Sequence, residues 1–224
     1  MNLDSLFLSL RLAATVSFLL LAIAMPLASW LAFSRWRGKF LLESIVALPL
    51  VLPPTVLGFY ALIALGPRGP VGQLWQSLFG HSLAFTFSGL VLASLAYSLP
   101  FAVQPLLASF ESLDRRLLDA SSLLGASRAR TFFRVIVPLS WPGLVTALVL
   151  SFAHTLGEFG VVLMVGGNLP GITRTVSIDI YDRAQALDYS GAHQMALLLL
   201  FISFVVLSIV YGINRRVWSP WFAR

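Results

Sequence analysis

The sequence predicts an all-α protein that crosses a membrane about five times. Of its 224 residues, 58% are hydrophobic and only 11% are charged, which is too little polar surface to cover a soluble globule of this size. Four uncharged stretches each exceed 20 residues, and a helix of about 20 apolar residues spans the roughly 30 Å hydrocarbon core of a bilayer. A fifth uncharged region adds one more span.

The spans follow from these stretches in chain order. The fifth region, residues 69–110, is too long for one span, and its early Gly, Gln and His residues predict a loop followed by a helix from about Leu83. All spans belong to a single membrane domain that covers residues 1–224. The expected spans are residues 10–33, 43–66, 83–109, 139–165 and 190–213.

Arginine and lysine gather in alternate connections, which predicts the orientation because these residues resist translocation. The first loop, the third loop and the tail are basic, whereas the second and fourth loops hold only Arg68, Arg174 and Arg183. The N-terminus is therefore expected outside and the C-terminus inside. This topology explains the net charge of +6, so lipid is an expected partner and nucleic acid is not. The basic set is Arg35, Arg37, Lys39, Arg115, Arg116, Arg128, Arg130, Arg134, Arg215, Arg216 and Arg224.

The third loop, residues 111–138, is expected to be a cytoplasmic surface for a partner. Its five arginines are a third of all the Lys and Arg in the chain. Leu117, Ala120 with Ser121, and Leu124 recur at helical spacing over about two turns, and Gly125 stands where the helix would end. The pattern predicts a short amphipathic helix.

Catalysis by this chain is not expected. It has no Gly-x-x-x-x-Gly-Lys-Ser/Thr loop around its only lysine, Lys39, so it cannot be its own ATPase. It also lacks a Gly-x-Ser-x-Gly elbow and a His-Glu-x-x-His motif, its three histidines are scattered, and it has no cysteine. We expect neither a metal site nor a cofactor in this chain.

The basic loop matches a known pattern. Its residues fit the spacing Glu-Ala-Ala-x3-Gly-x9-Ile-x-Leu-Pro, with Asp for Glu, Ser for the second Ala, and Val for Ile and Leu. This pattern resembles the cytoplasmic loop of ABC importer membrane subunits, in which the short helix docks on the ATPase subunit. The matching residues are Asp119, Ala120, Ser121, Gly125, Val135, Val137 and Pro138.

Three further segments are similar to the molybdate permease branch of that family. They are LPLVLPPTVLGFY from Leu48, TLGEFGVVLMVGGN from Thr155 and NLPGITRTVS from Asn168, although molybdate permeases often have Glu at the position of Ile172. The resemblance implies a type I ABC importer permease fold in the bacterial cytoplasmic (inner) membrane. It also implies a homodimer, two ATPase subunits that bind ATP and Mg²⁺, and an external oxyanion-binding protein.

Other substrates and mechanisms stay open on the sequence. Tungstate, sulfate and thiosulfate differ little from molybdate in size, and the binding protein usually selects among them. A secondary anion transporter or channel would need no ATPase. A membrane enzyme would need clustered polar residues at one depth, and only His154 and Glu158 approach that.

Proline and polar residues within the spans are candidates for the pathway or gate. Proline frees backbone carbonyls and bends a membrane helix, which is tolerated beside protein or a water-filled cavity. The second span is therefore expected to be broken or bent at Pro53 and Pro54, with Thr55 and Gln104 as polar groups inside the spans. A purely structural kink is the alternative.

Glu158 lies about midway along the fourth hydrophobic stretch, where a carboxylate is costly unless it is paired, solvated or protonated. Its four-residue spacing from His154 would place both on one helical face. We expect Glu158 to accept bonds from donors in the bundle, near a bend at Gly157 and Gly160, with a structural or gating role. Direct substrate contact and proton coupling are the alternatives.

The long outer loop, residues 166–191, offers hydroxyl and guanidinium groups that suit a tetrahedral oxyanion. The outer-mouth candidates are Asn168, Thr173, Arg174 and Thr175. The alternative is a polar loop that docks the binding protein.

Overall fold

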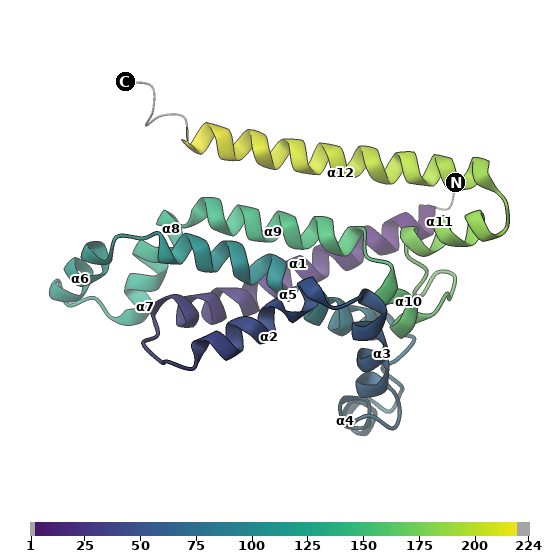
Figure 1. Cartoon of the computed structure of the whole chain (residues 1–224), viewed down its shortest axis with the longest axis horizontal. Coiled ribbons are helices and arrows are strands. Elements are labelled where there is room, and N and C mark those ends of the chain that lie inside the picture. Colours follow the sequence, from purple (N-terminus) through teal and green to yellow (C-terminus); the bar gives the residue numbers. More distant parts are fainter. Residues whose placement is uncertain (1–2, 219–224) are drawn as a thin grey trace.

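The computed structural model describes residues 3–218, and over that range the chain folds into helices without a strand. The long helices lie side by side and form an elongated bundle (Figure 1). In chain order the elements are α1 Leu3–Phe33, α2 Lys39–Val51, α3 Pro54–Leu65, α4 Pro70–Phe79, α5 Phe87–Glu111, α6 Arg115–Leu123, α7 Arg128–Thr131, the π-helix η1 Phe132–Ile136, α8 Val137–Leu139, α9 Trp141–Leu156, α10 Gly160–Gly166, α11 Val176–Gln185 and α12 Tyr189–Trp218.

The predicted all-α, multi-pass class is confirmed. Among the described residues, α1, α5 and residues Tyr189–Ser208 of α12 are each long and apolar enough to cross a membrane. Two bent pairs reach that length only together: α2 with α3, which meet at 113°, and Arg128–Leu139 with α9, which meet at 75°. The chain thus has material for up to five spans.

Prolines break the second expected span. Leu52 and Pro53 are extended, and α3 starts afresh with Pro54 at its first position, where a missing N–H costs nothing. The fourth expected span, residues 139–165, is also interrupted, because α9 ends at Leu156 and α10 begins at Gly160.

The expectation of a loop before Leu83 was wrong. Residues Pro70–Phe79 form α4, which has Pro70 in its first turn and Gly80 at its end with φ of 76°. Both are ordinary start and stop signals. The following span begins at Phe87 rather than Leu83, because the Thr86 side chain caps α5 by accepting a bond from the Gly89 amide.

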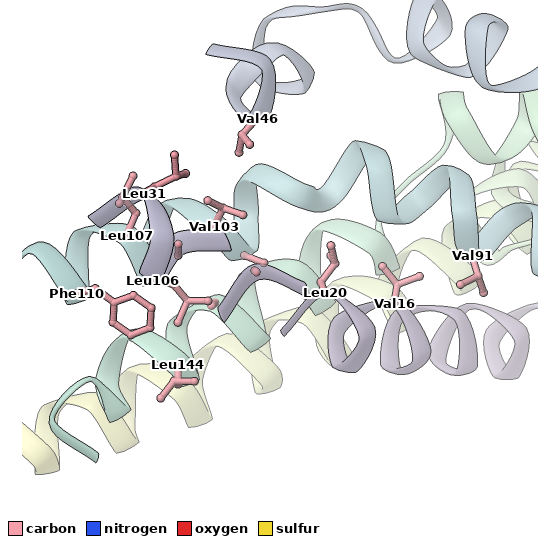
Figure 2. Packing of buried hydrophobic residues seen from close by; sticks show 14 of the residues in the cluster. Val16, Leu20, Leu31, Val46, Val91, Val103, Leu106, Leu107, Phe110 and Leu144 are labelled. Atoms are coloured by element: carbon pink, nitrogen blue, oxygen red, sulfur yellow. The ribbon is translucent and has the colours of Figure 1, made fainter. Parts of the chain in front are cut away.

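The core lies where α1, α5 and α9 pack together. Leu12, Val16 and Leu20 of α1 are fully buried at helical spacing and continue toward Leu31. Figure 2 shows Val16, Leu20 and Leu31 of α1 in one cluster with Leu106 of α5 and Leu144 of α9. Because three helices supply this core, it fixes the positions of the breaks and loops that follow.

The two ends of the bundle differ. The basic loop with α6 lies at one end, together with the end of α12 (Figure 1). The start of α1 lies at the other end, beside α10 and α11. There Arg183 of α11 donates to Asp179 at 3.1 Å and to Asp188 at 3.0 Å. The Gly191 amide and Arg183 lower the pKa of Asp188 below its ordinary value.

Ser9 of α1 caps α11, and removing its hydroxyl should destabilise this end of the bundle. The buried Ser9 hydroxyl accepts a 2.8 Å bond from the Val176 amide. Ser9→Ala leaves that buried N–H unsatisfied, which costs about 1–3 kcal/mol. Thermal unfolding of the purified protein measures the loss. Ser17→Ala is the matched control, because Ser17 only donates to the Ala13 carbonyl of its own helix. Equal effects of the two variants would contradict the capping role.

Candidate functional site

The predicted helix of the basic loop is α6, and both of its ends are defined by bonds. The Asp114 carboxylate accepts a 2.9 Å bond from the Arg116 amide at the start. At the other end the Ala126 amide donates to the Ser121 carbonyl at 3.1 Å, and the Gly125 amide donates to the Ser122 carbonyl at 3.0 Å. This is a Schellman motif, and Gly125 adopts the required left-handed conformation with φ of 76°.

Several apolar side chains at and after α6 are not covered by the rest of the subunit. Leu117 is 47% exposed, Leu124 is 88% exposed, and no residue of α6 is buried. Asp119 and Ala120 are exposed on the same helix, whereas Ser121 is half-buried. An exposed apolar surface on an ordered helix suits a protein partner.

The return from α6 to the bundle is ordered as well. The Ser121 hydroxyl lies 2.8 Å from the Thr131 hydroxyl, which joins α6 to α7. The π-helix η1 comes next and is followed by α8, which contains Pro138. Phe132 of η1 contacts Phe110 edge-to-face. Because Phe110 belongs to the core, the loop is connected to α5 through packed side chains.

A cavity of about 580 Å³ brings together most of the predicted pathway residues. It lies between the start of α3, α5 and the break between α9 and α10. Pro53 immediately precedes it as the residue before α3, whereas Gln104 is exposed elsewhere on α5. Tyr97 of α5 also lines the cavity, although no motif in the sequence marks it as a site residue. The predicted residues on its lining are Pro54, Thr55, His154, Gly157, Glu158 and Gly160.

Glu158 lies in the break after α9 and is only 4% exposed. No hydrogen bond of full geometry reaches either carboxylate oxygen among the described residues, and the donor in the bundle that interacts with it is the Ser94 hydroxyl. This Ser94 hydroxyl belongs to α5 and is itself buried, and it faces the carboxylate without forming a bond of full geometry. Burying a carboxylate without full hydrogen bonding costs free energy. Additional hydrogen-bond donors, or a proton on the carboxylate, would lower that cost.

The possible pair of His154 with Glu158 does not form. Because α9 ends at Leu156, Glu158 does not continue the helical face on which His154 lies. The Nδ1 atom of His154 is instead 2.9 Å from the Ser98 hydroxyl, and its ring stacks on Phe101 with centroids 3.8 Å apart. The histidine is therefore held against α5.

Gly160 allows α10 to pack directly on α3, and a side chain there should disturb the cavity. A Cβ atom at Gly160 would lie 2.7 Å from the Cβ of Pro54. Gly160→Ala should therefore lower stability by about 1–3 kcal/mol through overpacking. Thermal unfolding tests this, with Gly212→Ala on α12 as control because nothing lies within 4 Å of its added Cβ. An unchanged Gly160→Ala protein would mean that α3 and α10 move apart freely.

The outer-mouth candidates are used largely for bonds within the loop. Asn168 donates to Asp182 of α11, and Arg174 donates to Asn168 and lies 3.5 Å from the Asp182 carboxylate. The buried Thr173 hydroxyl donates to the Gly166 carbonyl at 2.7 Å. The Thr175 hydroxyl is buried without a bond in the described range. These groups do not form one anion site, because the Arg174 guanidinium is already paired with the Asp182 carboxylate.

Comparison with known proteins identifies the family to which the chain belongs. Residues 24–219 match the family model described as the binding-protein-dependent transport system inner membrane component. The chain is 52% identical over 214 residues to the molybdenum transport system permease protein ModB of Azotobacter vinelandii, covering 96% of this chain and 95% of that protein. It is 36% identical to ModB of Escherichia coli K12, covering 95% and 91%.

A sulfate-related protein and solved structures also match. The probable sulfate transport system permease protein cysT of Chlorella vulgaris is 36% identical, covering 79% of this chain and 66% of that protein. The MetNI methionine ABC transporter shares the fold with a TM-score of 0.73 at 16% identity, covering 97% and 96%. A bacterial ABC transporter for alginate has a TM-score of 0.72 at 18% identity, covering 95% and 80%.

Proposed function

Because the chain belongs to the family of binding-protein-dependent transport system inner membrane components, we propose that it is the permease subunit of an ATP-driven importer for molybdate. The observation that carries the substrate is the 52% identity to a molybdenum permease along 96% of the chain. In this proposal the subunit moves the substrate across the membrane by changing conformation and catalyses no covalent reaction. The sulfate-related match makes sulfate the second candidate.

The basic loop faces the cytoplasm in this proposal, with the N-terminus outside and the C-terminus inside. Five of the chain's 14 arginines lie in this loop, and arginine-rich connections stay on the cytoplasmic side. The exposed side chains of α6, from Leu117 to Leu124, then meet the ATPase subunit. Gly125 ends α6, and Pro138 lies in the first turn of α8, where the loop rejoins the bundle.

Two copies of the chain, two ATPase subunits and an external oxyanion-binding protein form the working assembly. The ATPase subunits hold ATP and Mg²⁺, since this sequence has no phosphate-binding loop of its own. This chain supplies the route through the membrane.

Coupling runs through packed side chains. Closure of the ATPase pair on ATP moves α6, and the Ser121–Thr131 and Phe110–Phe132 contacts carry that shift to α5 and η1. A rigid link between two states is what such a transition requires. The cavity at the α9–α10 break then opens outward, and hydrolysis reverses the movement. Release is fast because the path needs no deep anion well.

Molybdate uptake in a strain lacking its own permease tests the proposal. Cells that express this chain with its partner ATPase and binding protein should accumulate molybdate, and excess sulfate should compete poorly. Uptake of sulfate in preference to molybdate would replace the substrate. Anion movement by the purified chain alone, down a gradient in vesicles, would replace the mechanism with a secondary transporter or channel.

A further inference from the structure

A second cavity, of about 530 Å³, separates the last turn of α1 from the basic loop. This volume lies within the range of small-ligand sites. One wall is formed by Trp30 and Phe33 of α1, and Phe132 of η1 faces it. This space is separate from the cavity at the α9–α10 break, and it is not lined by Leu117 or Ala120 of α6.

The lining of this cavity is amphipathic. Beside the aromatic wall it carries the hydroxyls of Ser34, Ser122 and Thr131 and the guanidinium of Arg128. No acidic side chain forms an ion pair with Arg128 among the residues that the structure describes. An arginine with nearby hydroxyls suits a phosphate group, and the aromatic wall suits a hydrocarbon chain.

Tryptophans mark the depth of the cavity. Trp30 and Trp36 contact each other with ring centroids 5.8 Å apart, and Trp141 begins α9 at the same end of the bundle (Figure 1). All three are about half exposed. Tryptophan gathers at the boundary between the hydrocarbon core and the headgroups, so the cavity lies where lipid headgroups lie.

We propose that this cavity binds an anionic phospholipid of the inner leaflet, with Arg128 on its phosphate and an acyl chain along Trp30 and Phe33. Basic pockets between membrane helices on the cytoplasmic side bind such headgroups. Free phosphate would satisfy only the arginine and leave the aromatic wall without an apolar partner. The assignment to the inner leaflet rests on the orientation given under the proposed function.

The bound lipid would contact both the end of α1 and the basic loop, which carries the proposed coupling contacts. Its cavity has α1 on one side and α6, α7 and η1 on the other. A lipid bound there fills the space between the basic loop and the last turn of α1. Arg128 and Thr131 contact it from the same helix that bonds to α6 through Ser121.

Quenching of Trp30 by brominated lipids tests the site in the complete transporter with its ATPase subunits. The complex is reconstituted in vesicles that contain brominated phosphatidylglycerol or brominated phosphatidylcholine at equal bromine content. The signal of Trp30 is the difference between the protein and its Trp30→Phe variant. We expect stronger quenching by phosphatidylglycerol. Arg128→Gln should weaken that preference about fivefold, the factor for about 1 kcal/mol per arginine near a membrane surface.

Matched variants separate the site from general charge effects. Arg130→Gln removes the same charge from the same short helix but does not line the cavity, so it should keep the preference, and Arg128→Lys should largely retain it. Equal quenching by both lipids, or equal losses in the Arg128→Gln and Arg130→Gln variants, would overturn the proposal. Displacement by inorganic phosphate would identify a small-anion site instead. Binding is measured without molybdate, so failed uptake would count against the transport function alone.

Discussion

Replacing Ala120 by arginine is expected to reduce molybdate uptake by roughly tenfold or more and to abolish stimulation of the ATPase. Ala120 is exposed on α6, in the loop proposed to dock on the ATPase. A long charged side chain would hold that surface away from its partner. A loss of about 1.4 kcal/mol in docking free energy already weakens binding tenfold, and central interface residues often contribute about 2 kcal/mol.

The reason to expect a clean result is that α6 contributes no buried residue to the subunit. The Ala120→Arg chain should therefore insert and unfold like the parent protein. Ala129→Arg is the matched control, since it adds the same charge at an exposed position of α7. Uptake is measured in cells and ATPase activity in reconstituted complexes. Normal transport by the Ala120→Arg protein, or equal losses in both variants, would contradict docking through this face.

Replacing Glu158 by glutamine is expected to stabilise the protein and to impair transport. The carboxylate is almost fully buried, and among the described residues no hydrogen bond of full geometry compensates its charge. Leaving a buried polar group unsatisfied costs about 1–3 kcal/mol, and more when it is charged. The neutral amide lowers that cost, so the unfolding midpoint should rise by about 2–4 °C per kcal/mol gained.

Transport should fall because Glu158 lies in the break between α9 and α10, on the cavity that also contains Thr55 and Tyr97. Stability sacrificed at one position commonly serves function. Glu43→Gln is the control, since that carboxylate is partly exposed and lies 3.6 Å from Lys39. Normal uptake by the Glu158→Gln protein would remove this carboxylate from the mechanism. A lower unfolding midpoint would mean that it has a stabilising partner in the assembled transporter.

Local signals predicted some features of this fold closely. Gly125 ends α6 because the residue after a helix often needs a positive φ, which glycine adopts without strain. The double proline breaks the second span because proline has no N–H to donate. For α4 the signals at Pro70 and Gly80 were equally present. The polar Gly, Gln and His residues of this segment favour a loop over a helix when hydropathy alone is considered.

Other features depended on residues far apart in the chain. Tyr97 joins Glu158 in one cavity only because α5 packs beside α9. Arg174 is a candidate anion ligand in the sequence, but in the structure α11 places the Asp182 carboxylate beside it. Hydropathy records whether a segment is apolar, but it does not record the angle at which two helices meet. Hydropathy therefore could not predict the 113° angle between α2 and α3.

The sequence by itself predicted a helical membrane protein with five apolar spans and a basic, helix-forming loop. Those properties follow from composition, from the lengths of apolar stretches and from motifs of neighbouring residues, all of which are local. Only the tertiary structure decided that Glu158 is almost fully buried and that a second cavity lies beside the basic loop. Burial and cavities arise from packing between distant segments, because the same side chain is costly or harmless according to what surrounds it.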